Sequence, residues 1–345
     1  MRDSLRQLAL TRFREFVREP EALFWALLFP ILLSLGLGLA FRNRPAEMVH
    51  VGVVARRPAD FAILESLRAS SGVAAESLGA DAARLALRTG RIALVVLTTE
   101  TGGIVYEFDD TRPDARTARF LADDAIQRDR GRTDPVAVAE RQVRERGSRY
   151  IDFVVPGLLG LGLMGNGVWS IGFTIVDARR KRLLKRFMAT PMSRVEYLAS
   201  FIISRFALLV VEVLLLVGFA ALVFDVPLRG SLVELAAICV LSALSFCALG
   251  LLCAARPRTI EGANGVMNLA MVPMWILSGV FFSAENFPRV IQPFIQALPL
   301  TAVNDALRAN MLRGAGFDVV GPELAIMLAW GAGCFVLALR LFRWR

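Results

Sequence analysis

Residues 198–224 read LASFIISRFALLVVEVLLLVGFAALVF, an apolar run in which Arg205 and Glu212 are the charged side chains. A helix of this length can cross a hydrocarbon layer of about 30 Å, since each helical residue adds about 1.5 Å. The run is long and continuous, unlike the shorter apolar stretches of a soluble core. The stretch therefore predicts a membrane-spanning helix.

Other runs of the same character lie along the 345-residue chain. The chain is 55% hydrophobic with a mean hydropathy of +0.53, and the excess is concentrated in these runs, as bilayer spans require. We therefore expect a polytopic α-helical membrane protein with six transmembrane helices. The further spans are expected at 22–41, 151–176, 232–255, 262–282 and 323–339.

Residues 1–21 precede the first span and combine an apolar face with several arginines, a pattern that predicts an amphipathic helix in the membrane interface. The run 22–41 is longer than the apolar core of a signal peptide. No small-x-small cleavage site follows it before Arg42. An uncleaved anchor is therefore expected in preference to a cleaved signal peptide.

The basic residues are distributed asymmetrically about the predicted spans. They gather in 1–21, in the loop 177–196, in the turn 256–258 and at 340–345, which fall on one side of the membrane. Because Arg and Lys collect in cytoplasmic loops, both termini are expected in the cytoplasm of a bacterium, beneath its inner membrane. The formal charge of +9 then indicates contact with anionic membrane lipids and no nucleic acid partner.

This orientation leaves residues 42–150 on the outer side as one soluble domain. Apolar alternation and helical periodicity predict short strands and helices there, so we expect an inserted extracytoplasmic α/β domain. The strands are expected at 49–54, 92–97 and 103–108, and the helices at 59–68, 82–88, 115–128 and 136–146.

Residues 283–322 are apolar but contain Pro288, Pro293 and Pro299, which interrupt a continuous spanning helix. We expect a re-entrant or extracytoplasmic segment, with an amphipathic surface loop as the alternative.

The side chains exclude most catalytic chemistry. The four cysteines all lie in apolar runs and His50 is the single histidine, so no catalytic, cofactor-binding or metal site is predicted. A Walker A loop needs a lysine after a glycine-rich turn and before Ser or Thr. The lysines, Lys181 and Lys185, are each followed by Arg. We therefore expect this chain not to hydrolyse ATP.

Residues 177–194 read DARRKRLLKRFMATPMSR. On a helix the apolar residues of this loop share one face and the basic residues point away, until Thr190-Pro191 ends the helix. A helix of this kind can dock in a groove on a partner protein, or lie as a basic loop on anionic lipid. The candidate contact residues are Arg180, Arg182, Leu183, Leu184, Phe187, Met188, Thr190 and Pro191.

The loop resembles the coupling segment of type-2 ABC (ATP-binding cassette) exporter permeases, with matches at 184–186, 189–191 and 193–194. Arg180, Arg182 and Leu183 stand where that family often has Glu, Gly and Thr. A second stretch is also similar to the family: a Ser-Gly-x-x-Phe pattern within 277–288, Leu-Pro-Leu-Thr at 298–301 and Asn-Asp-Ala-Leu-Arg at 304–308.

The resemblance implies a permease that forms the translocation pathway for a lipophilic substrate, such as a drug, a lipid or an antibiotic. It implies a separate ATPase subunit that uses the ATP, so that this chain binds no cofactor. It also implies a second permease subunit, identical or a close paralogue, with a periplasmic adaptor as a further candidate partner. The alternatives are a secondary transporter driven by an ion gradient, for which inverted repeats are not evident, and a membrane sensor or scaffold.

Polar residues inside the predicted spans are candidates for the translocation path, because ionisable groups at membrane depth are costly. We expect Glu212 to face a cavity or to pair with another span, and Arg205 to reach the cytoplasmic interface. Asn166, Asn264 and Asn268 could form hydrogen bonds between helices. Gly157, Gly160 and Gly167 leave one face of the second span bare, which predicts close helix packing within the chain or a homodimer contact.

Overall fold

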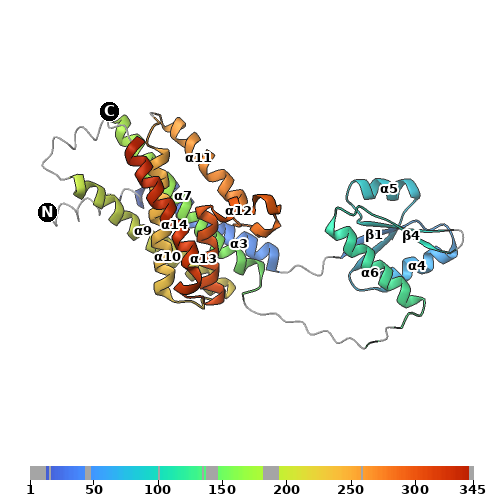
Figure 1. Cartoon of the computed structure of the whole chain (residues 1–345). Helices are drawn as coiled ribbons and strands as arrows, with labels where there is room; N and C mark the ends of the chain where they lie inside the picture. The colour runs from blue at the N-terminus through green and yellow to red at the C-terminus, as the bar shows by residue number, and fades with distance from the viewer. Residues whose placement is uncertain are drawn as a thin grey trace. The chain divides into compact units, whose positions relative to one another are not determined.

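The computed structural model describes residues 13–14, 17–42, 48–99, 102–133, 136, 147–181, 194–257 and 259–341. The chain forms two compact units (Figure 1). The helical unit comprises Met1–Arg42 with Val143–Arg345, and the α/β unit comprises Asn43–Gln142. Each unit has its own hydrophobic core.

In the helical unit, α10 packs against both α7 and α14, and α13 packs against the same two helices. Helix α11 packs along α7, and so does α3. The long helices are α3 (Phe29–Arg42), α7 (Tyr150–Arg180), α9 (Arg194–Phe224), α10 (Leu232–Cys253), α11 (Ile260–Leu277), α13 (Pro299–Arg313) and α14 (Phe317–Leu341), and the short ones are α2 (Pro20–Leu23), the π-helix η1 (Phe24–Leu28), the 3-10 helices η2 (Ala284–Asn286) and η3 (Arg289–Ile291), and α12 (Gln292–Gln296).

Within the described residues, five helical stretches are long and apolar enough to cross a membrane. This confirms a polytopic helical membrane protein. The sixth expected span, 262–282, coincides with α11, which is not among the five. Helix α11 ends at Leu277, before the end of the expected span, and its polar residues include Glu261, Asn264 and Asn268. The span at 262–282 stays a prediction. The five stretches are Phe24–Phe41, Tyr150–Asp177, Phe206–Phe224, Leu232–Cys253 and Phe317–Leu341.

The first span contains a local widening of the helix. Residues Phe24–Leu28 form a π-helix immediately before Phe29 and Pro30. Proline has no N–H, and its ring would collide with the carbonyl of the residue four positions earlier in a regular α-helix. The π-turn relieves that conflict without ending the helix.

Three prolines of 283–322 stand at the starts of helices, whereas Pro322 lies inside α14. Pro288 directly precedes η3, Pro293 lies in the first turn of α12, and Pro299 is the first residue of α13. Proline is favoured at these positions, because the first N–H groups of a helix have no partner within it.

The last helix, α14, begins at Phe317, earlier than the apolar run 323–339, because an acidic first turn extends it with Asp318.

The α/β unit contains a four-stranded sheet with the order β2-β1-β3-β4. Strand β1 pairs in parallel with β2 (Val51 opposite Ala75) and with β3 (Gly52 opposite Val95), whereas β3 and β4 are antiparallel (Val96 opposite Tyr106). The strands are β1 (Val49–Val53), β2 (Val73–Ser77), β3 (Leu94–Thr98) and β4 (Ile104–Glu107), and the helices are α4 (Pro58–Ala69), α5 (Ala80–Arg88) and α6 (Pro113–Asp129).

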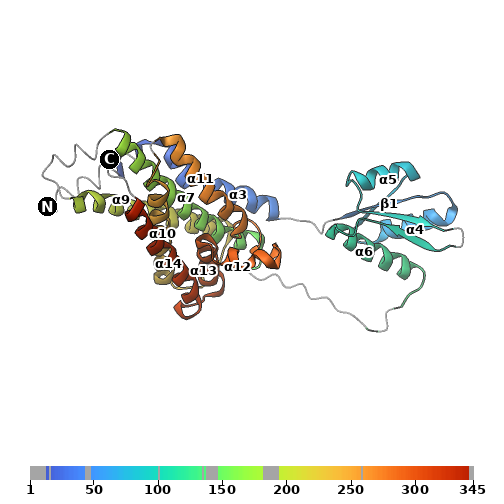
Figure 2. The same cartoon turned by 45° about the horizontal axis from the view of Figure 1, so that its top comes forward.

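Helices cover both faces of this sheet (Figure 2). Leu94 and Val96 of β3 share a core cluster with residues of α4 and α6, whereas Val95 joins a cluster with α5. The alternation follows from the two-residue period of a strand. Strand β2 was not predicted from the sequence, and the helix expected at 136–146 lies almost wholly outside the described residues.

Candidate functional site

Of the residues predicted to contact a partner ATPase, Arg180 belongs to the described part. It is the last residue of α7, and its side chain is exposed. Its neighbour Lys181 caps the helix and pairs with Asp177, with 2.8 Å between Nζ and Oδ2. The other predicted contact residues lie outside the described residues: Arg182, Leu183, Leu184, Phe187, Met188, Thr190 and Pro191.

Arg179 binds the end of α10. Its Nη1 donates hydrogen bonds to the carbonyl oxygens of Ala254 (3.2 Å) and Pro257 (2.8 Å), and its Nη2 donates one to Ala255 (3.4 Å). The carbonyl groups at a helix C-terminus lack partners within the helix and carry partial negative charge, which a guanidinium satisfies. Arg179 thus joins the last turn of α7 to the turn between α10 and α11, and we call these contacts the Arg179 clamp.

The clamp was not singled out from the sequence. Arg179 is one of seven basic residues in the loop 177–196, and the pattern there does not distinguish it from Arg180. The available signal was position, since Arg179 is the first basic residue after the apolar run of α7.

The glycines of α7 lie against residues of the same chain. A Cβ added at Gly157 would come 2.5 Å from the carbonyl oxygen of Val280, and one at Gly167 would come 2.7 Å from the Cβ of Phe246. A Cβ at Gly160 would collide with Asn304. These three positions therefore allow α7 to approach α10, α13 and the segment after α11.

The approach of α7 to α10 is reciprocal. A Cβ added at Gly250 of α10 would come 2.6 Å from the carbonyl oxygen of Val168. Glycine on both helices brings their backbones close together, as small residues do in membrane helix pairs. Gly250 was not predicted from the sequence, because it lies in an otherwise uniformly apolar run.

Glu212 is buried in α9, with 4% of its surface exposed. Its Oε1 lies so close to Gly162 of α7 that a Cβ there would collide with it. The carboxylate therefore faces another predicted span. Arg205 lies in the same helix, but its side chain is outside the described part.

The asparagines behave differently from one another. Asn268 donates a 3.1 Å hydrogen bond to Asn264, four residues earlier in α11. The bond therefore lies within one helix, whereas a bond between helices was expected. Asn166 of α7 is half-buried.

The residues of the second motif meet where α7, α11 and α13 converge. The Nε of Arg308 donates a 3.3 Å hydrogen bond to the backbone carbonyl of Phe153. The guanidinium carbon of Arg308 lies 3.8 Å from the centre of the Phe153 ring. Its Nη2 also donates to the carbonyl of Gly279. Asn304 donates to the carbonyl of Ser278 at 2.8 Å. Helix α13 thus holds the end of α11 against the start of α7.

The chemistry of this junction explains two residues of the motif. Gly279 has φ of +70°, a conformation that favours glycine. Burial lowers the pKa of Arg308 to about 10, partly offset by Asp305, so its guanidinium remains charged at neutral pH. A buried charge that binds carbonyl groups and a ring fixes the geometry of the turn around it.

Within the residues that the structure describes, no group of three or more His, Cys, Asp or Glu side chains could hold a metal ion. What the site contains is a set of helix contacts: the Arg179 clamp, the glycine face of α7, the buried Glu212 and the Arg308 junction. Such contacts are suited to transmit movement between helices.

Comparison with protein families matches residues 20–340 to the family described as ABC-2 family transporter protein. The chain is similar to the inner membrane transport permease YhhJ of Escherichia coli, with 27% identity over 173 residues, 50% of this chain and 46% of YhhJ. It is similar to the probable multidrug ABC transporter permease YbhS of Escherichia coli, with 23% identity over 335 residues, 90% of this chain and 89% of YbhS. A third relative, the inner membrane transport permease YadH of Escherichia coli, is 28% identical over 154 residues, 44% of this chain and 57% of YadH. The match to YhhJ spans about half of that protein's length.

Proposed function

This chain belongs to the ABC-2 family of transporters, and from that premise we propose that it is the membrane-spanning permease subunit of an ATP-binding cassette exporter. The observation that carries the proposal is the family match over residues 20–340, which includes every predicted span. The similarity to the permease YbhS over 90% of the chain supports it.

The segment 177–194 couples the permease to a separate ATPase subunit. The ATPase binds and hydrolyses the ATP, and this chain binds no cofactor. When ATP binding closes the ATPases, the docked segment moves, and the Arg179 clamp passes the movement to α10 and α11. Support comes from the position of the clamp, one residue before Arg180 and directly continuous with the segment.

In the proposed arrangement the chain is a multi-pass protein of the bacterial inner membrane with both termini in the cytoplasm. Residues 42–150 then lie on the outer side, and 262–282 supplies the sixth span. Two permease subunits, identical or paired with a close paralogue, enclose the pathway, and a periplasmic adaptor could join them. The distribution of arginines supports this orientation.

The proposed substrate is lipophilic, of the kind represented by drugs, lipids and antibiotics. The predicted spans supply mainly apolar side chains for a lining. The polar residues proposed to face the pathway are Glu212, Asn166 and Asn268, with Arg205. The relative YbhS is named a probable multidrug ABC transporter permease, which is consistent with such a substrate class.

The test is co-purification with a co-expressed ATP-binding cassette ATPase. Replacing Arg182, Lys185 and Arg186 together by Glu should abolish the association and ATP-dependent transport. Arg256→Glu, a charge reversal outside the segment, should retain both. An ATPase that still co-purifies with the triple variant contradicts the coupling role.

The alternatives give other results in the same preparation. Transport that persists without nucleotide and stops when an ionophore collapses the ion gradient identifies a secondary transporter. Ligand binding without transport identifies a sensor or scaffold.

A further inference from the structure

The α/β unit contains a cavity of about 390 Å³ at one edge of its sheet. Its lining includes Thr98 at the end of β3, Arg56 and Asp60 at the start of α4, and Arg84 of α5. A volume of this size suits a small molecule. The proposed transport function assigns no role to this cavity.

Sheet topology places the cavity at a point where chain connections diverge. From β1 the chain passes through α4 to β2 on one side, while β3 pairs with β1 on the other side. In open parallel sheets, ligands bind beyond the carboxyl ends of the strands at such a switch point. The cavity reaches the carboxyl ends of β1 and β3, where Val54 and Thr98 line it, and it extends along β3 to Val95.

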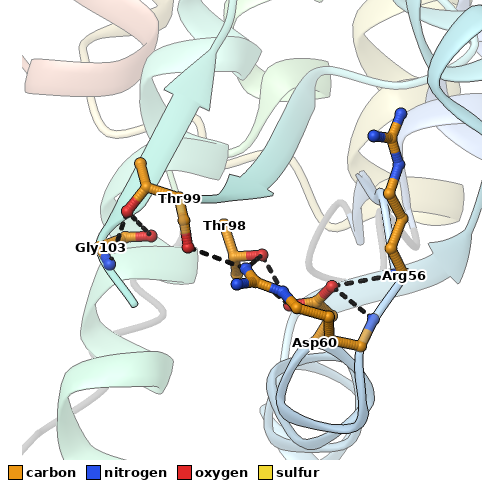
Figure 3. A network of polar contacts seen from close by, with 6 residues as sticks. Arg56, Asp60, Thr98, Thr99 and Gly103 are labelled. Carbon is orange, nitrogen blue, oxygen red and sulfur yellow. Dashed lines mark hydrogen bonds and ion pairs between the residues drawn. The ribbon is translucent and has the colours of Figure 1, made fainter. Parts of the chain in front are cut away.

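One wall of the cavity is fixed by a network of hydrogen bonds (Figure 3). Asp60 accepts the backbone N–H groups of Arg56 (2.8 Å) and Arg57 (2.9 Å) on one oxygen and the hydroxyl of Thr98 (2.6 Å) on the other. Arg57 donates to Thr98 (2.6 Å) and to the carbonyl of Thr99 (2.8 Å). The network ties α4 to the end of β3, so the wall is formed before any ligand arrives.

The network leaves two cations of the lining without a protein partner. The Nη2 of Arg57 lies 3.7 Å from the Oδ1 of Asp60, so the charges of these two side chains compensate each other. Within the described part of the chain, the guanidinium groups of Arg56 and Arg84 make no hydrogen bond or ion pair. The side chain of Arg56 extends away from Asp60 in Figure 3. Glu107 is the other carboxylate in the lining.

We propose that this cavity binds a phosphate group, held by the guanidinium groups of Arg56 and Arg84. Guanidinium groups present paired N–H donors that match phosphate oxygens, and a phosphate has enough oxygens to serve two of them. The phosphate belongs to a water-soluble ester or to a lipid head group, which share this chemistry. The negative charge of Glu107 repels the phosphate and weakens its binding to the cavity.

The test measures binding to the full chain by titration calorimetry, in micelles of an uncharged detergent at fixed ionic strength. The probes are glycerol 1-phosphate in one arm and phosphatidylglycerol added to the micelles in the other. Arg56→Gln and Arg84→Gln should each weaken binding about tenfold. Arg88→Gln removes the same charge from α5 outside the cavity and should leave the affinity unchanged. Glu107→Gln should tighten binding.

Binding of the soluble ester assigns a free phosphate compound, and binding of the lipid alone assigns a head group. Either result supports the site if the binding is weakened by Arg56→Gln and by Arg84→Gln. The proposal is overturned if neither probe binds, or if Arg88→Gln weakens binding as much as Arg84→Gln. ATP-dependent transport is measured separately, so loss of this site and loss of the exporter function are distinguishable.

Discussion

Arg179 donates a 2.8 Å hydrogen bond to the carbonyl oxygen of Pro257, a residue 78 positions later in the chain. The bond connects the last turn of α7 with the turn after α10, next to the segment proposed to dock on the ATPase. Movement of that segment acts on α7 directly and on α10 and α11 through this contact. The clamp therefore gives the proposed coupling a specific structural path.

Replacing Arg179 by Gln should lower both stability and coupling. A hydrogen bond to a charged group contributes about 1.5–3 kcal/mol. Because Arg179 is half-buried, we expect the free energy of unfolding to fall by about 2 kcal/mol. ATP hydrolysis by the partner should continue while transport per ATP falls. Thermal unfolding in detergent and transport in proteoliposomes measure the two effects.

The matched control for that variant is Arg256→Gln. Arg256 lies in the same turn as Ala255 and Pro257, and its side chain is exposed. It should change neither unfolding nor coupling. Equal losses in the two variants would show that the charge of the turn matters and the clamp does not.

Gly157 and Gly165 lie on the same helix but face different surroundings. A Cβ at Gly157 would meet the backbone of Val280 at 2.5 Å, whereas one at Gly165 would meet Trp169 at an ordinary 3.7 Å. We expect Gly157→Ala to destabilise the protein by about 1–3 kcal/mol, because the backbone must shift. Gly165→Ala should change stability by less than about 1 kcal/mol. Equal unfolding midpoints in detergent would contradict this packing.

The apolar runs identify most of the helical unit because burial in lipid imposes a minimum length on each spanning helix. Boundaries are less predictable. The start of α14 at Phe317 depends on an acidic first turn, which hydropathy does not register. The helix α11 mixes polar and apolar residues, so its sequence alone does not decide whether it spans.

Strand β2 shows why part of the sheet escaped prediction. Its sequence, VAAES, lacks the alternation of large apolar residues that marks a strand. Val73 is its fully buried residue, and the strand exists through pairing with β1 from Val49 opposite Val73 onwards. Long-range pairing of this kind overrides weak local preference.

The site was predictable to the extent that it depends on residue type. Glycines at spacings of three and seven predict close packing of α7, and a glutamate in an apolar run predicts a buried ionisable group. The Arg179 clamp and the Arg308 junction depend on which helices meet, which local sequence does not specify. Resemblance to a family located the motif at 304–308, and the structure supplies its contacts.

Glu212→Gln tests whether the buried carboxylate serves transport. Glutamine keeps the shape of the side chain and replaces the ionisable carboxyl group, and an ionisable residue at membrane depth is expected to have a function. We expect ATP-dependent transport to fall about tenfold with unchanged helical content, which corresponds to about 1.4 kcal/mol. Glu261→Gln, at the exposed start of α11, is the control. Full transport with normal folding in Glu212→Gln would remove this role.

The α/β unit should lose stability in acid through Asp60. Burial raises the pKa of Asp60, but hydrogen bonds from Thr98, Arg56 and Arg57 and the charge of Arg57 outweigh it, so its pKa lies below the ordinary value. A carboxyl group with a lowered folded-state pKa stabilises the fold at pH values above its unfolded-state pKa of about 3.9. That contribution is lost as the pH falls through the folded-state pKa.

Thr98→Val removes one bond from Asp60 and should therefore raise the pKa of that carboxyl group toward the ordinary value. The variant should lose about 1–2 kcal/mol at neutral pH. Because the folded-state pKa of Asp60 then lies closer to its unfolded value, the remaining acid-induced loss should be smaller and complete at a higher pH than in the unmodified chain. Hydrogen exchange of the α4 amides, corrected for intrinsic rates, measures both between about pH 3 and 7. Thr117→Val is the matched control, because its exposed hydroxyl donates to Pro113 of its own helix. If protection of α4 falls equally in both variants, or the deficit of Thr98→Val stays constant throughout acidification, Asp60 does not depend on Thr98.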